Sequence, residues 1–148
     1  IIGIKETLWT LPFVLVRESK ERDTFSRRLA CIYAMEAASW WSPQPGVTWK
    51  PSDTLEIALR CSRGERVTNN ALEEAESVAW NAVDILRHST SHQGYASIAA
   101  AVAATVNPYA ATTAADAADH AVRAIIAWLP SGEPDERLWQ TRVFRENL

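Results

Sequence analysis

The sequence predicts an all-α protein, a compact single-domain bundle of about six helices with an alanine-rich, tightly packed core and no sheet. The 148 residues include 24 alanines but only five glycines, and alanine has the highest intrinsic helix propensity. Apolar residues recur at spacings of three and four, which is the period of an amphipathic helix. A chain of this length suits one domain. We therefore expect residues 1–148 to form one helical unit, with residues 1–20 as a peripheral segment.

The first helix is expected from about residue 24 to residue 40. Before it, residues 1–16 leave two alternatives open, a short apolar helix broken near Pro12 or an extended segment lying across the core. From residue 24 onward a largely apolar stripe indicates a helix. Two prolines and a glycine, Pro43, Pro45 and Gly46, then end it, because neither residue type continues a helix well.

Two further helices follow this loop. Pro51 to Asp53 begins one helix, and Gly64 ends it. Thr68 to Asn70 caps the next one. The inward face of that second helix should consist of Leu72, Ala75, Ala79, Ala82, Val83 and Leu86.

The last three helices are separated by prolines. One helix is expected over residues 95–106, and Asn107 and Pro108 then form a turn. A long helix follows this turn and ends at Leu129, and the last helix begins at Pro134. Fifteen of the 32 residues from 96 to 127 are alanine, and such small side chains let helix axes approach closely. The inward stripe of the last helix is predicted to be Leu138, Trp139, Arg142 and Val143.

Composition and charge exclude several functions. The net charge of −3 and the interleaving of basic with acidic residues argue against nucleic-acid binding. The longest apolar run, residues 8–16, is about half of the ~20 residues that a membrane span needs. Cys31 and Cys61 are too few and too far apart for a disulfide framework. We expect both thiols to be buried and the protein to be cytoplasmic, with no membrane partner.

Four polar residues are candidates for a polar or metal site: Asp116, His120, Glu36 and His88. Asp116 and His120 are one helical turn apart and fit either an ion pair or a ligand pair. Glu36 lies on an apolar stripe, where a carboxylate needs a partner. His88 and His92 have metal-ligand spacing, but the polar residues between them favour a helix end.

No three-ligand set and no nucleophile or phosphate-loop motif is complete. The sequence therefore predicts no cofactor and no enzyme. A small metal-dependent or acid–base enzyme that uses these residues remains the alternative.

Three segments carry a family resemblance: RLACIYAMEAA at 28–38, DTLEIALRCSRGE at 53–65 and TAADAADHA at 113–121. Together they resemble the alanine-rich, all-helical immunity proteins of bacterial polymorphic-toxin systems, over about two-thirds of the chain. His120 matches the second histidine of that family's TAHxxxHA signature, whereas Asp116 stands in place of the first. The resemblance implies a protein that neutralises a cognate toxin by direct binding.

A binding protein needs a rigid surface with a few aromatic anchors. Trp40, Trp41 and Trp49 gather around one proline-rich loop, and we predict that this loop contacts the partner protein. Packing of these tryptophans in the core is the competing interpretation. A phage or scaffold helical module that binds a structural partner is a further alternative.

Overall fold

The computed structural model describes residues 19–89, 92–109, 113–128 and 133–147. Within these ranges the secondary structure is entirely helical, which confirms the predicted fold class. The helices are α3 (Ser19–Ala38), α4 (Pro51–Ser62), α5 (Asn69–His88), α6 (Gln93–Thr105), α7 (Thr113–Trp128) and α8 (Glu133–Glu146). The alternatives for residues 1–16 and the peripheral segment at 1–20 lie almost wholly outside the described residues.

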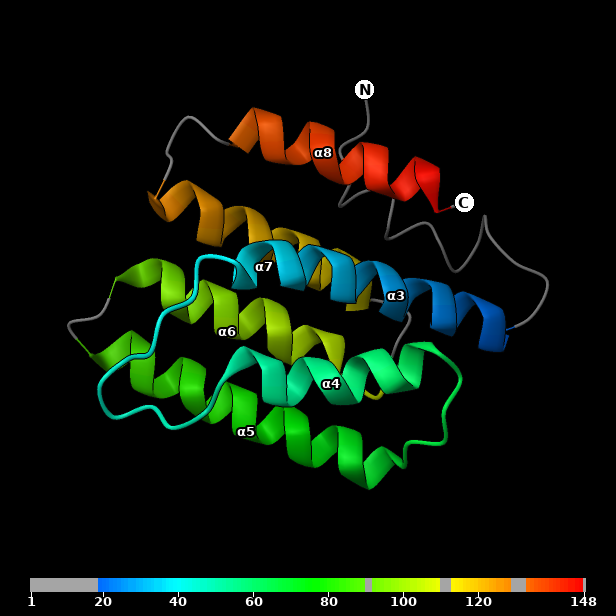
Figure 1. Cartoon of the computed structure of the whole chain (residues 1–148), viewed down its shortest axis with the longest axis horizontal. Helices are drawn as coiled ribbons and strands as arrows, with labels where there is room; N and C mark the ends of the chain where they lie inside the picture. The colour runs from blue at the N-terminus through cyan, green and yellow to red at the C-terminus, as the bar shows by residue number, and fades with distance from the viewer. Residues whose placement is uncertain (1–18, 90–91, 110–112, 129–132, 148) are drawn as a thin grey trace.

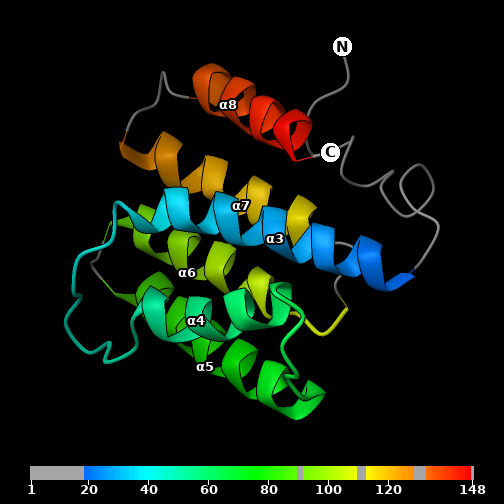
Figure 2. The ribbon, with the colours of Figure 1, turned by 45° about the vertical axis from the view of Figure 1, so that its right-hand side comes forward.

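The helices stack from α8 at one edge of the molecule to α5 at the opposite edge, with α3, α6 and α7 between them (Figures 1 and 2). Helix α6 packs on α7, α5, α3 and α4, and is the most enclosed element. Ten of its residues are buried, six of them alanines. Such small side chains allow α6 to lie close to its neighbours. The packing of the alanines of α6 against the adjacent helices, chiefly α7, therefore forms the centre of the core.

The local sequence explains where the helices begin and end. Pro51 occupies the first turn of α4 after the extended residue Lys50, a position where its missing N–H costs nothing. Gly64 ends α4 with a φ of 82°, in the left-handed region that favours glycine. The side chain of Thr68 caps α5 by accepting a hydrogen bond from the amide of Ala71 at 3.1 Å.

The predicted inward face of α5 is confirmed, since all six of its residues are buried. The stripe predicted for α8 is confirmed at Val143, which is buried, and at Trp139, which packs against the core, but it is wrong at Leu138 and Arg142. Leu138 is 70% exposed and Arg142 is exposed, whereas Gln140 is fully buried. The Gln140 side-chain amide donates to the carbonyl of Ala118 in α7 at 3.1 Å, and the Tyr33 hydroxyl of α3 donates to the Gln140 backbone carbonyl at 3.1 Å. These hydrogen bonds turn a polar residue inward, which hydrophobic periodicity does not register.

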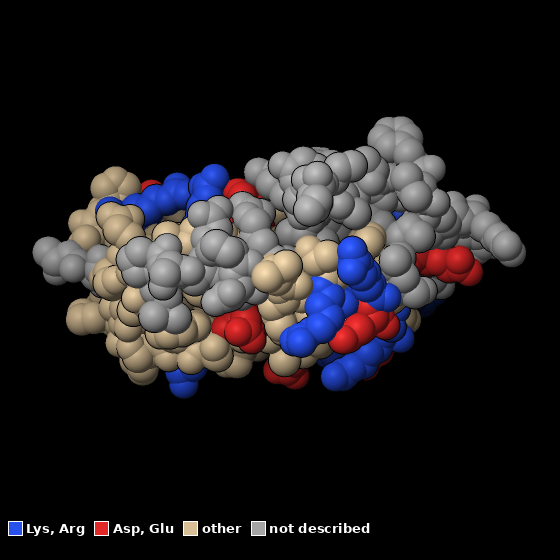
Figure 3. Space-filling view, turned by 90° about the horizontal axis from the view of Figure 1, so that it is seen from above, with Lys and Arg blue, Asp and Glu red and all other residues tan. Residues whose placement is uncertain are grey.

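The described helices do not include one with the length and apolar character needed to cross a membrane. Seen from above in Figure 3, basic and acidic side chains lie next to one another on the described surface. This arrangement matches the interleaving of charges along the sequence.

Arg27 ties α3 to the end of α6. Its side chain is 4% exposed, and its guanidinium donates to the carbonyls of Thr105 at 2.6 Å and Asn107 at 3.0 Å. The last carbonyls of a helix have no partner within the helix and carry its negative dipole end. The buried cation therefore satisfies the C-terminus of α6 with both charge and hydrogen bonds.

Replacing Arg27 with methionine should lower the free energy of unfolding by about 2–4 kcal/mol, because one buried and one partly buried carbonyl lose a charged donor. Urea denaturation measures the change. Arg28→Met is the matched control, since Arg28 is the exposed neighbour on the same helix, and surface substitutions are usually within about 0.5 kcal/mol. Equal destabilisation by the two variants would contradict the role of Arg27.

The two cysteines differ in their surroundings. Cys31 is 1% exposed, as expected, whereas Cys61 is only partly buried. Burial raises the pKa of the Cys31 thiol to about 12, and this outweighs the nearby charge of Arg27, which lowers that pKa. Because the thiolate is the reactive form, Cys31 is protected at neutral pH.

Iodoacetamide at pH 8 should therefore alkylate Cys61 in the native protein and spare Cys31, which is about one part in ten thousand thiolate at a pKa four units above the pH. Mass spectrometry of the peptides identifies the labelled residue. In urea both thiols should react. Rapid labelling of Cys31 in a folded Cys61→Ser variant would contradict the burial of Cys31.

Candidate protein-binding surface

The loop between α3 and α4 is anchored by Trp49. This side chain is 8% exposed, and its indole N–H donates to the Thr54 hydroxyl of α4 at 2.9 Å. Gly46, with a φ of 78°, provides the left-handed turn of the loop. The buried Trp49 and its hydrogen bond to Thr54 thus attach the loop to α4, and most of the Trp49 side chain belongs to the core.

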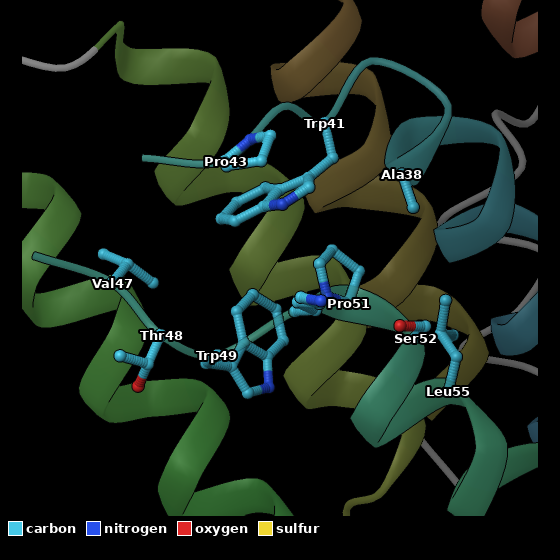
Figure 4. Close-up of a pocket in the computed structure, with 10 residues that line it drawn as sticks. Ala38, Trp41, Pro43, Val47, Thr48, Trp49, Pro51, Ser52 and Leu55 are labelled. Carbon is cyan, nitrogen blue, oxygen red and sulfur yellow. The ribbon is translucent and has the colours of Figure 1, made fainter. Parts of the chain in front are cut away.

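An open hollow of about 460 Å³ lies beside this loop. Figure 4 shows the side chains of Trp41 and Trp49 beside this hollow. The two rings meet edge to face, with centroids 5.5 Å apart and an interplanar angle of 85°. We call this cavity the tryptophan hollow. Lys50 is its one charged residue among those described, and its lining is Ala38, Trp41, Pro43, Val47, Thr48, Trp49, Lys50, Pro51, Ser52 and Leu55.

The three predicted tryptophans therefore differ in exposure. Trp40 is 37% exposed, Trp41 is half-buried, and Trp49 is almost wholly buried. The core-packing interpretation describes most of Trp49, although this residue also lines the hollow. Trp41 and Trp40 present more of their rings to the surface.

A series of aromatic ring contacts connects Trp41 of the tryptophan hollow to helices α6 and α7. Trp41 contacts Tyr95 of α6 at a centroid distance of 5.6 Å, and Tyr95 contacts Trp128 of α7 at 5.2 Å. The Trp128 indole in turn stacks on His92 at 4.5 Å and on Trp40 at 5.5 Å. Three segments distant in the sequence thus meet in one aromatic cluster, which positions Trp41.

Gly94 makes room for this cluster. A Cβ atom at Gly94 would lie 2.3 Å from the Trp128 ring, closer than atoms can approach. Gly94 also donates its backbone N–H to Nδ1 of His92 at 3.1 Å, so that His92 caps α6. The absence of a side chain at this residue is what lets the indole lie against the start of α6.

Gly94→Ala should lower the free energy of unfolding by about 1–3 kcal/mol, because the added methyl group must displace the indole. Thermal unfolding and the near-UV circular dichroism of the tryptophans report the change. The control is Gln93→Ala, an exposed neighbour in the same helical turn. A Gly94→Ala protein with wild-type stability and an unchanged tryptophan spectrum would contradict the packing described here.

The four polar candidates occupy three different helices. Asp116 and His120 are half-buried on α7, one turn apart, and the His120 ring lies 6.3 Å from that of Trp80 in α5. Glu36 is half-buried on α3. His88 is exposed at the end of α5, with Nδ1 2.8 Å from the carbonyl oxygen of Asp84. No group of three or more His, Cys, Asp or Glu side chains that could hold a metal ion occurs in the described part of the chain.

His88 and His92 do not share a helix, because α5 ends at His88 and α6 begins at Gln93. The polar residues between them predict this break, and the structure has one. The sequence pattern does not show that Tyr95, His92 and Trp128 belong to one aromatic cluster. Their one local signal is the position of aromatic residues at helix ends, which does not reveal which ends meet.

Comparison of the chain with protein-family models, with curated proteins and with solved structures finds no match in any of the three.

Proposed function

We propose that this protein acts by binding another protein at the tryptophan hollow, as an immunity-type protein that neutralises a cognate bacterial toxin. The observation that carries the proposal is an apolar hollow of about 460 Å³, which is large enough for one or two side chains of a partner. Tryptophan and tyrosine around a pocket are the residues that most often dominate the binding energy of an interface.

The rigidity of the surface also supports this proposal. Trp41 is held between Trp49 and Tyr95, and the loop is tied to α4 through Trp49 and Thr54. A surface already in its bound shape loses little conformational entropy on association. An inhibitor that acts by direct contact depends on such a surface and needs no catalytic group.

Co-expression with the product of the neighbouring gene tests this function, with rescue of growth and formation of a stable complex as the readouts. Trp41→Ala should weaken the complex by about 2 kcal/mol or more, roughly 30-fold in Kd. Ser52→Arg should weaken it too, because Ser52 is an exposed residue of the hollow and a long charged side chain would obstruct it.

Leu138→Arg is the control, because it places the same charge on α8, where Leu138 is 70% exposed. It should bind and protect as the wild type does. Circular dichroism establishes that each variant is folded. Wild-type protection by both folded hollow variants would overturn the binding site, and failure of the wild-type protein to protect or to bind would overturn the proposed partner.

A further inference from the structure

A second hollow lies between α4 and α5, on the other side of Trp49. Its volume is about 440 Å³, and Thr48 and Trp49 line both hollows. We call it the acidic hollow. Its lining is Thr48, Trp49, Asp53, Thr54, Ile57, Ala71, Glu74, Ala75 and Val78. Because the two hollows share residues, a partner seated in the tryptophan hollow would reach the acidic hollow as well.

The apolar part of this surface continues along α5. Val78 and Ile85 are each 46% exposed, and their separation of seven residues places them on the same side of the helix. Helix α5 forms an edge of the molecule in Figure 1 and packs chiefly on α6 and α4. The flank that carries Val78 and Ile85 is therefore open to a partner beside the acidic hollow.

The charge of the hollow is negative. Asp53 and Glu74 are its only charged residues among those described. One Asp53 oxygen accepts a hydrogen bond from the backbone N–H of Lys50 at 3.3 Å. Glu74 forms no ion pair with a described residue. Further carboxylates lie on the same helix: the pKa of Glu76 is raised by partial burial and, to a smaller degree, by the charge of Glu73.

We infer that the acidic hollow takes a segment of the partner protein that carries an arginine or lysine beside an apolar side chain. The apolar side chain lies against Val78 and Ala75, and the cation lies between Glu74 and Asp53. Opposite charges across an interface attract and orient the partner, and arginine suits a carboxylate best because its planar fork matches both oxygens. This inference rests on the proposed function, of which it specifies the partner's chemistry.

The charge also argues against other occupants. The carboxylates would repel a phosphate backbone or an anionic membrane surface. A metal ion would need a third ligand, and the described residues contain no such group. A cationic and partly apolar protein segment is the one occupant that complements both the carboxylates and the exposed valine.

Two blocked peptides test the inference on the full chain. One has the sequence Gly-Leu-Arg-Ala-Leu-Arg-Gly, and the other has glutamate in place of both arginines. In a titration followed by ¹H–¹⁵N NMR, the arginine peptide should shift the amide signals of Ile57, Ala71 and Val78. The glutamate peptide should leave them unchanged. Higher salt should weaken binding, because exposed charge pairs are screened.

Glu74→Gln should weaken binding of the arginine peptide about two- to fivefold, the range expected for one partly exposed charge pair. Val78→Ser should weaken it as well. The matched control is Glu73→Gln, which removes the same charge from the adjacent residue, outside the hollow, and should leave the affinity within the error.

Absence of binding by the arginine peptide, equal binding of both peptides, or an equal effect of the two glutamine variants would each overturn the inference. These outcomes leave the proposed function standing, because its test uses protection by the whole protein and variants of the tryptophan hollow. Conversely, loss of the proposed toxin partner would not alter which peptide binds.

Discussion

The close contact of α6 with α7 and α3 is the constraint on which the other features of this structure depend. From residue 98 to residue 104 α6 is an apolar run in which every residue is buried, and five of the seven are alanines. The facing surface of α7 is also built of alanines, such as Ala117, Ala118 and Ala121. Side chains of this size allow helices to approach closely at native packing density, but they leave no space for a large ring between the axes.

Apart from Phe25 and the fully buried Tyr33 on α3, the large rings of the described residues lie in loops, where helices end, or on the outer helices α5 and α8. Trp40, His92, Tyr95 and Trp128 meet at one end of the bundle, where α3 and α7 finish and α6 begins. This cluster positions Trp41 and, through it, the tryptophan hollow. The proposed binding surface is therefore linked to the alanine packing, because the contact of α6 with α7 leaves no room for rings such as those of Tyr95 and Trp128, which meet at its end. Two buried polar side chains connect neighbouring helices. Arg27 of α3 donates a hydrogen bond to the end of α6, and Gln140 of α8 donates one to α7.

Local patterns predicted the six helices of the described residues and most of their limits. The strongest were the amphipathic stripe of α5 and the signals Pro51, Gly64 and Thr68 at helix ends, all of which act within a few residues of the chain. The stripe predicted for α8 included the exposed Leu138 and Arg142 and missed Gln140, because Gln140 is buried through hydrogen bonds with partners more than twenty residues away.

The loop with Trp40, Trp41 and Trp49 could be named from the sequence, since the prolines mark it. The burial of Trp49 could not, because it depends on Thr54 and the packing of α4. The acidic hollow had no local signal, because the glutamates in the second turn of α5 resemble ordinary solvated residues until α4 is placed beside them.

Hydrogen exchange of the backbone amides, measured residue by residue on the native protein, tests whether the alanine contact holds the fold together. Amides in the most enclosed element should exchange only through global unfolding. We expect those of α6 between residues 98 and 104, with the facing amides of α7 near Ala118, to exchange most slowly of all the described residues. Faster exchange in α6 than in α5 or α8 would contradict this expectation, because the framework of the fold would then lie outside the alanine core.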